Sequence, residues 1–202
     1  GFDKVVWKAS PFFFFFEEEA LELRYLSMDG EEGFPGNLQV KVIYTLTNDN
    51  EIKIDYEAVP DAKTILNLTN HAYFNLKGAG EGAITSHDLV LNSDSFTPTD
   101  AGAIPTGKIQ SVSNTPMDFR VAHKIGEHIN EDYIELKQGI GYDHNWVLNK
   151  KNNELSWAAT VYEASTGIEL KAFTTEPGVQ FYSGNYLNIN NDVFEYHNKN
   201  FA

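Results

Sequence analysis

Three short segments combine ionisable or amide side chains with aromatic residues, and they hold the groups best suited to chemistry. They are Asn70-His71-Ala72-Tyr73-Phe74-Asn75, Gly141-Tyr142-Asp143-His144-Asn145-Trp146, and residues 175–185, TEPGVQFYSGN. This composition is typical of a pocket in which polar groups hydrogen-bond the hydroxyls of a sugar and rings stack on its C–H face. Strand-like alternation breaks at His71, just before a turn. From the residues alone, His71 is a structural histidine, a metal ligand or a proton donor.

Several other kinds of active site are poorly supported. The six histidines form no His-x-His or HExxH pattern, which zinc sites often use. His123 and His128 are five residues apart, a spacing at which neither a strand nor a helix places both side chains for one metal ion. We therefore predict no metal site. There is no G-x-S-x-G elbow and no cysteine, which argues against a covalent nucleophile. Proton transfer by histidine and carboxylate, or binding alone, remains.

Composition and charge limit the kinds of molecule that the protein is expected to bind. The 202 residues, 42% of them hydrophobic, predict one globular domain, 1–202. No apolar run reaches the length of a membrane span, and the N-terminus has no signal-peptide pattern. A net charge of −14 disfavours nucleic acid and anionic membranes as partners. Only two arginines, Arg24 and Arg120, are present, which argues against a phosphorylated substrate. A neutral polyhydroxylated ligand fits best, and the lack of cysteine fits the reducing cytoplasm.

The elements that must position these groups are short strands. Period-two alternation and turn residues predict strands over Val5–Lys8, Leu21–Leu26, Gln39–Leu46, Glu51–Tyr56, Thr64–Asn67, Asp88–Asn92, Asn145–Asn149, Leu155–Glu163, Ile168–Thr174 and Gln180–Tyr182. Helical patterning is scarce, with one short turn expected at Ile125–Asn130. The Phe12–Phe16 run is interpreted as part of an edge-strand hairpin. Many short strands with Gly, Pro and Asn between them indicate an all-β sandwich or barrel-like fold.

Six blocks, in order, resemble the aldose 1-epimerases, the galactose mutarotases. They are the stretch 27–38 (SMDGEEGFPGNL), Asn70–Leu76 (NHAYFNL), Ile104–Gly107 (IPTG), Thr115–Arg120 (TPMDFR), Gly141–Asn145 (GYDHN) and Thr174–Asn185. The resemblance implies a large, mostly antiparallel β-sandwich, and an isomerase that interconverts the α and β anomers of free hexoses such as galactose and glucose without a cofactor. Matched by position, His71 resembles the general acid that protonates the ring oxygen. Tyr73, Asp143 and Gln180 resemble substrate-binding residues.

The chain also departs from that pattern. The resemblance implies a general-base glutamate in a "LETQ"-like block downstream, and an arginine and an "HGG" histidine upstream, and none of these occurs here. Either the chain is an incomplete part of a longer enzyme, cut at both ends, or it is a true short homologue with lost or altered activity; we expect the first. Glu176 is a poor substitute for the base because it matches a glutamate in a structural turn. The alternatives are a sugar-binding β-sandwich without catalysis and, less well supported, a hexose-6-phosphate epimerase.

Overall fold

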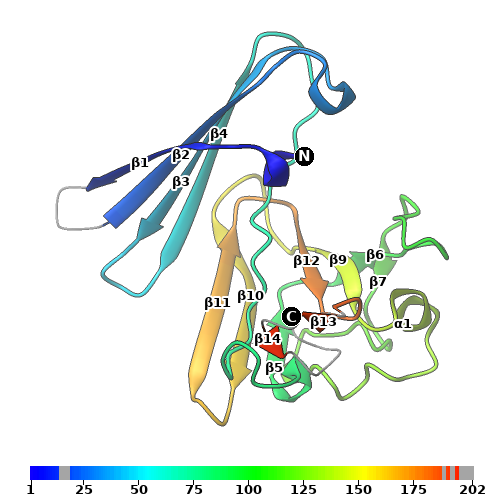
Figure 1. Ribbon diagram of the computed structural model, residues 1–202. Helices are drawn as coiled ribbons and strands as arrows, with labels where there is room; N and C mark the ends of the chain where they lie inside the picture. Colours follow the sequence, from blue (N-terminus) through cyan, green and yellow to red (C-terminus); the bar gives the residue numbers. More distant parts are fainter. Residues whose placement is uncertain (14–18, 188–189, 192–193, 196–202) are drawn as a thin grey trace. The chain divides into compact units, whose positions relative to one another are not determined.

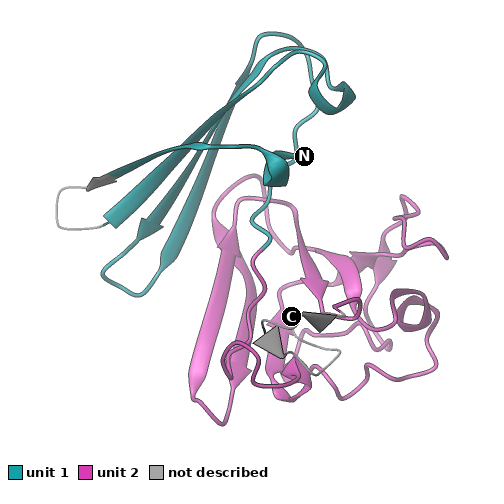
Figure 2. Ribbon diagram, viewed as in Figure 1, with its two compact units in different colours: residues 1–71 teal, residues 72–202 magenta. Residues whose placement is uncertain are grey.

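The computed structural model describes residues 1–13, 19–187, 190–191 and 194–195. Nearly all its regular structure is antiparallel β-sheet, which confirms the predicted fold class. Contacts divide the chain into two compact units, Gly1–His71 (unit 1) and Ala72–Ala202 (unit 2), coloured separately in Figure 2. In the part of the chain that the structure describes, no helix has the length and apolar character needed to span a membrane. The single-domain interpretation of 1–202 stays a prediction.

The elements are numbered in chain order, and Figure 1 labels the α-helix and most of the strands. In unit 1 they are the 3-10 helices η1 (Phe2–Lys4) and η2 (Glu31–Gly33) and the strands β1 (Lys8–Phe13), β2 (Glu19–Ser27), β3 (Leu38–Leu46) and β4 (Ile52–Pro60). In unit 2 they are η3 (Ile84–Ser86), β5 (Asp88–Leu91), β6 (Ser95–Thr97), β7 (Gln110–Ser111), β8 (His123–Lys124), α1 (Ile134–Gly139), β9 (Asp143–Val147), β10 (Ser156–Glu163), β11 (Ile168–Thr174), β12 (Gly178–Tyr182), β13 (Asn190–Asn191) and β14 (Phe194–Glu195).

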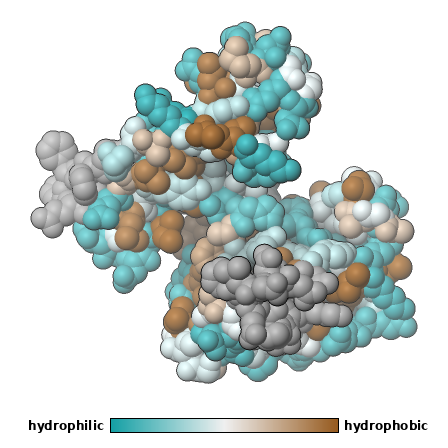
Figure 3. Space-filling view, in the orientation of Figure 1, coloured by the Kyte–Doolittle hydropathy of each residue, from teal (hydrophilic) through white to brown (hydrophobic). Residues whose placement is uncertain are grey.

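Unit 1 is a four-stranded meander in the order β1-β2-β3-β4, in which each strand pairs with its sequence neighbour. Alternation along β3 turns Leu38, Val40 and Val42 inward to form its small core. A turn closes the β3–β4 hairpin with Asn50 in the left-handed region at φ 61°, a conformation that asparagine tolerates well. Large apolar side chains are exposed on this unit, and hydrophobic residues are visible at its surface in Figure 3.

Unit 2 is a β-sandwich, in which two four-stranded antiparallel sheets pack around one core. The sheets have the orders β11-β10-β5-β8 and β12-β9-β6-β7. The core draws on both of them, with Leu89 and Ala159 from the first and Phe96 and Trp146 from the second. Trp146 also donates its indole N–H to the Met117 carbonyl at 3.0 Å, so its one polar group is satisfied.

Two predictions about the elements need correction, and one helix was not predicted. Thr64–Asn67 is not a strand: the stretch 63–75 has no regular structure, and Ile65 is 76% exposed. Val5–Trp7 precede β1, which begins only at Lys8. The helix α1 was not predicted. Its six residues are too few for a helical period to be recognised.

Two further expectations concern turns and the phenylalanine run. The segment Ile125–Asn130 forms hydrogen-bonded turns, as expected for a single short turn. β1 is an edge strand that pairs antiparallel with β2, in line with the hairpin interpretation. Phe14–Phe16 lie outside the described residues.

Candidate functional site

The candidate site of unit 2 lies on the face of β9 and β12 that points away from the core. Along β9, His144 and Trp146 are buried, while Asp143 and Asn145 point to the opposite side, as the period of two requires. The antiparallel register places Tyr182 opposite Asp143 and Gln180 opposite Asn145. The Gln180 side-chain amide donates to Asp143 Oδ1 at 2.9 Å. Two of the predicted substrate-binding residues, Asp143 and Gln180, are therefore in direct contact.

Aromatic rings border this polar pair. The rings of Tyr73 and Tyr182 are 5.5 Å apart between centroids, and those of Tyr182 and Tyr186 are stacked at 6.3 Å. The Tyr186 backbone N–H donates to the Tyr182 hydroxyl oxygen at 2.7 Å. Burial raises the pKa of Tyr182, so its phenol is neutral and can donate a proton in a hydrogen bond. Tyr73, the third predicted substrate-binding residue, thus joins Asp143 and Gln180 through Tyr182.

Tyr182 and Tyr186 were not singled out from the sequence as site residues. Two signals could have found Tyr182: it lies in the TEPGVQFYSGN segment, and it shares the face of Gln180 two residues away. Tyr186 lies beyond β12 in a turn, where no periodicity applies. Its stacking on Tyr182 could not be read from spacing.

The Asn185 side chain holds together two of the segments that carry the site. Its amide N–H groups donate to the carbonyls of Gly139 and Tyr142 at 2.9 and 2.8 Å. Gly141 lies between these residues with φ +129°, and a Cβ there would lie 2.5 Å from the Asn185 amide oxygen. Only glycine allows this conformation and this close approach. The turn before Asp143 is therefore fixed against the end of the β12 segment.

A buried histidine–glutamate pair supports the Asp143 backbone from inside. His144 Nδ1 accepts the Asp143 N–H at 3.2 Å, and His144 Nε2 lies 3.2 Å from Glu135 Oε2. The same Glu135 oxygen accepts from the Thr99 N–H at 2.9 Å and from its hydroxyl at 3.2 Å. Burial lowers the pKa of His144, against the opposing charge of Glu135. The ring is therefore neutral, with its single N–H on Nε2 facing Glu135.

A second pair of the same design supports the segment that contains Tyr73. His87 Nε2 accepts the Leu76 N–H at 3.0 Å, and His87 Nδ1 lies 3.2 Å from Glu163 Oε2. Both side chains are buried, and burial lowers the pKa of His87. In each pair one ring nitrogen accepts a backbone N–H and the other faces a glutamate. His87, Glu135 and Glu163 were not predicted as supports, because their partners are distant in the sequence.

The Glu163 carboxylate makes folding stability depend on acid pH. Hydrogen bonds from Ser165 and Ser86 hold it ionised, and the Ser165 bonds lead in lowering its pKa from 4.5 to about 2. Since the folded pKa is below the unfolded one, the unfolded chain binds this proton first as pH falls. The contribution of Glu163 is present above pH 4.5 and is lost between pH 4.5 and about 2.

We therefore expect the Glu163→Gln variant to lose less of its free energy of unfolding than the wild type across that pH window. Urea unfolding at pH values spanning the window measures this difference. Glu154→Gln, at an exposed position, should keep the wild-type pH dependence. Identical slopes for the Glu163→Gln variant and the wild type would contradict the assignment.

His71, the predicted acid, is exposed and is the last residue of unit 1. The neighbouring Asn70 donates its side-chain N–H to the Tyr44 hydroxyl on β3 at 2.9 Å, which ties this segment to the meander. Tyr73, Asp143 and Gln180 belong to unit 2. Glu176 is exposed in the turn between β11 and β12, with its N–H bonded to the Thr174 hydroxyl, as expected of a turn residue. The roles of the four predicted site residues stay predictions.

Residues 3–200 match the family model described as aldose 1-epimerase. The chain belongs to the aldose 1-epimerase family. Galactose mutarotase of Bos taurus is 42% identical over 187 residues, which cover 93% of this chain and 51% of that protein. Aldose 1-epimerase of Escherichia coli is 40% identical over 188 residues, covering 93% and 52%. The solved structure of galactose 1-epimerase from Lactobacillus acidophilus superposes with a TM-score of 0.81 at 32% identity, over 92% of this chain and 53% of that one.

The chain spans about half the length of the curated epimerases that it matches. Family membership confirms the resemblance inferred from the six sequence blocks. It also agrees with the antiparallel sandwich of unit 2, since the structural match is to an epimerase fold.

Proposed function

We propose that the protein carrying this chain is an aldose 1-epimerase, which interconverts the α and β anomers of free hexoses. The observation that carries the proposal is the Asp143–Gln180 hydrogen bond beside the rings of Tyr182 and Tyr73. A carboxylate and an amide suit the hydroxyls of a sugar, and the rings suit its C–H face. The relatives named galactose mutarotase support galactose as a substrate.

In the proposed reaction His71 acts as the general acid. Ring opening moves one proton from the C1 hydroxyl to a base and one proton from His71 to the ring oxygen, while the C1–O5 bond breaks. Rotation about C1–C2 presents the other face of the aldehyde. The ring oxygen then attacks C1, returns its proton to His71, and the new C1 oxygen takes back the proton from the base. Asp143 and Gln180 hold the sugar hydroxyls meanwhile, and no cofactor takes part. The base is not assigned to a described residue.

The ion pairs of both arginines favour a free sugar over a sugar phosphate. Arg24 is paired with Glu22, and Arg120 is held by two hydrogen bonds to Asp118. Because each guanidinium already has a carboxylate, neither is poised to clamp a phosphate. The net charge of −14 further supports a small neutral ligand rather than nucleic acid or a membrane. The cysteine-free sequence supports the cytoplasm as the proposed location.

Polarimetry tests the proposed activity. The full-length protein should speed the approach of freshly dissolved α-D-galactose or α-D-glucose to anomeric equilibrium. A rate equal to that in buffer would overturn the enzyme assignment. If calorimetry then showed saturable galactose binding, the result would favour the alternative of a sugar-binding protein without catalysis.

The Asp143→Asn substitution should weaken galactose binding about tenfold, because a hydrogen bond to a charged acceptor is worth roughly 1.4 kcal/mol more than one to a neutral acceptor. The asparagine oxygen can still accept from Gln180, so the fold should be unchanged. The KM from polarimetry measures the effect. Asp132→Asn is the matched control, since the Asp132 side chain is 88% exposed and outside the site. An unchanged KM in Asp143→Asn would remove Asp143 from the binding site.

A further inference from the structure

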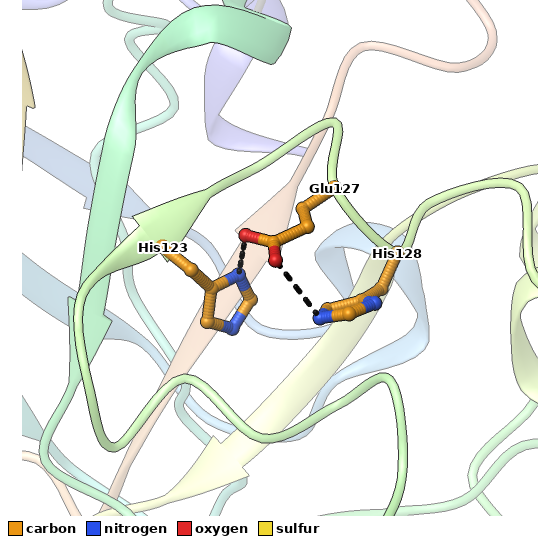
Figure 4. A group of neighbouring side chains, drawn as sticks. All are labelled: His123, Glu127 and His128. Carbon is orange, nitrogen blue, oxygen red and sulfur yellow. Dashed lines mark ion pairs between the residues drawn. The ribbon is translucent and has the colours of Figure 1, made fainter.

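Outside the candidate site, His123, Glu127 and His128 point their polar atoms toward one another (Figure 4). One Glu127 oxygen lies 3.8 Å from His123 Nδ1, and the other lies 3.8 Å from His128 Nε2. One donor atom from each residue lies within 4.8 Å of the other two. The five-residue spacing led us to expect that the histidines could not share an ion. That spacing suits neither a strand nor a helix, but the turns after β8 bring the two side chains together.

Hydrogen bonds on the far sides of the two rings determine which nitrogens carry lone pairs. His123 Nε2 lies 2.7 Å from the Asp118 carbonyl oxygen. A carbonyl only accepts, so the ring N–H of neutral His123 is on Nε2. Nδ1 also faces a carbonyl, that of Lys124, but at the longer distance of 3.3 Å. The shorter contact places the single N–H on Nε2, which leaves the lone pair on Nδ1, 3.8 Å from a Glu127 oxygen.

His128 is oriented in the same way by a carboxylate. Its Nδ1 lies 2.6 Å from Glu131 Oε1, so the N–H of the neutral ring donates there and Nε2 faces Glu127 with a lone pair. Histidines that bind metals commonly donate their second N–H to a carboxylate or a backbone carbonyl, which fixes the tautomer. Both arrangements occur here, one on each histidine.

Packing also limits how far the His123 ring can turn. It stacks on the Phe119 ring at 4.4 Å with an interplanar angle of 17°, and Phe119 is buried in the core of unit 2. The edge of the His128 ring meets the His123 ring at 5.1 Å. His123 is therefore a rigid member of the cluster, while Glu127 and His128 are more exposed and can adjust.

We propose that His123, Glu127 and His128 form a binding site for a divalent transition-metal ion, with Zn²⁺ the best fit. Two imidazoles and a carboxylate form a known three-residue zinc set, completed by a water molecule, whereas Mg²⁺ and Ca²⁺ prefer oxygen ligands. Bonds of about 2.0–2.1 Å place tetrahedral ligands about 3.3 Å apart. The three donor atoms now lie within 4.8 Å of one another, so the set must contract, and the more exposed Glu127 and His128 side chains can rotate to do this. A hollow of about 440 Å³, lined in part by both histidines, gives the fourth ligand access from solvent.

Calorimetric titration of the full chain, without a histidine tag, with ZnCl₂ tests the site. We expect one saturable site. Glu127→Gln should weaken binding at least tenfold, and Glu131→Ala should weaken it about 10- to 100-fold, the usual effect of losing a partner that orients a ligand. Glu154→Gln is the matched control, since Glu154 is an exposed glutamate outside the cluster, and it should bind like the wild type.

A second measurement separates a metal site from a pair of surface ion pairs. Bound Co²⁺ should give intense visible absorption typical of low coordination number, and this absorption should disappear in the His123→Ala/His128→Ala double variant. Circular dichroism should show that the variant keeps its β-sheet signal. The absence of saturable Zn²⁺ binding by the wild type, or equal binding by the double variant, would overturn the proposal.

Discussion

Replacing His71 with asparagine should lower kcat for mutarotation about 10²- to 10⁴-fold, the usual contribution of a general acid. Asparagine can hydrogen-bond the ring oxygen of the sugar but cannot transfer a proton to it. His71 is exposed and lies outside regular structure, so the variant should unfold at the wild-type temperature. Polarimetry of the full-length protein gives kcat, and thermal unfolding followed by circular dichroism gives Tm.

Chemical rescue tests directly whether the His71 side chain supplies the proton. In a His71→Gly variant, added imidazole should restore part of the lost turnover, because it can supply the proton from solution. The same imidazole should not change the rate of the Asp132→Asn control. Wild-type turnover in His71→Asn would show that His71 is not the acid, and the proton donor would then have to be sought elsewhere.

The Glu135→Ala substitution should have the largest effect on stability, about 3 kcal/mol. It would leave the Thr99 N–H and the Thr99 hydroxyl buried without their acceptor, and it would remove the carboxylate that lies 3.2 Å from His144 Nε2. Buried donors that lose their acceptor cost about 1–3 kcal/mol each. Urea unfolding measures the loss, and Glu154→Ala, at an exposed site, should change stability little.

The Glu135 prediction extends to sugar binding, since His144 accepts the Asp143 N–H. Without Glu135 to hold its tautomer, His144 can place its proton on Nδ1 and repel that N–H. Glu135→Gln keeps an acceptor oxygen, so it should fall between the wild type and Glu135→Ala in both stability and KM. A Glu135→Ala variant as stable as the wild type would show that water or other groups replace the carboxylate.

Local pattern was enough to predict the strands that alternate or that end in clear turns. The expected strand over Ile168–Thr174 agrees with β11, and the Gln39–Leu46 strand differs from β3 by one residue. Alternation alone was misleading at Thr64–Asn67, where a strand-like pattern occurs without strand pairing. A strand needs a partner, and pairing depends on distant segments that a local pattern does not contain.

The candidate site, like the strands, was predictable only where local sequence determines it. The blocks that carry Asp143 and Gln180 identified two residues that meet across β9 and β12. Their support was not predictable, because His144 meets Glu135, and Glu135 meets Thr99, only after the loops have folded. The His123–His128 cluster was not predicted for a different reason. A turn has no period, so sequence spacing alone does not show where its side chains lie.

The difference between the meander of unit 1 and the sandwich of unit 2 has a consequence for folding kinetics. Every ladder of the meander joins strands that follow one another in the chain, so it requires only short loops to close. In the sandwich, β5 pairs with β10 through Leu91 and Ala159, and β6 pairs with β9 through Phe96 and Trp146. Such distant pairings lose more chain entropy before any contact forms, and they slow folding. The strands β9 and β12, which carry Asp143 and Gln180, therefore belong to the high-contact-order part of the chain. The face of these strands that bears the candidate site forms only once the long-range ladders have closed.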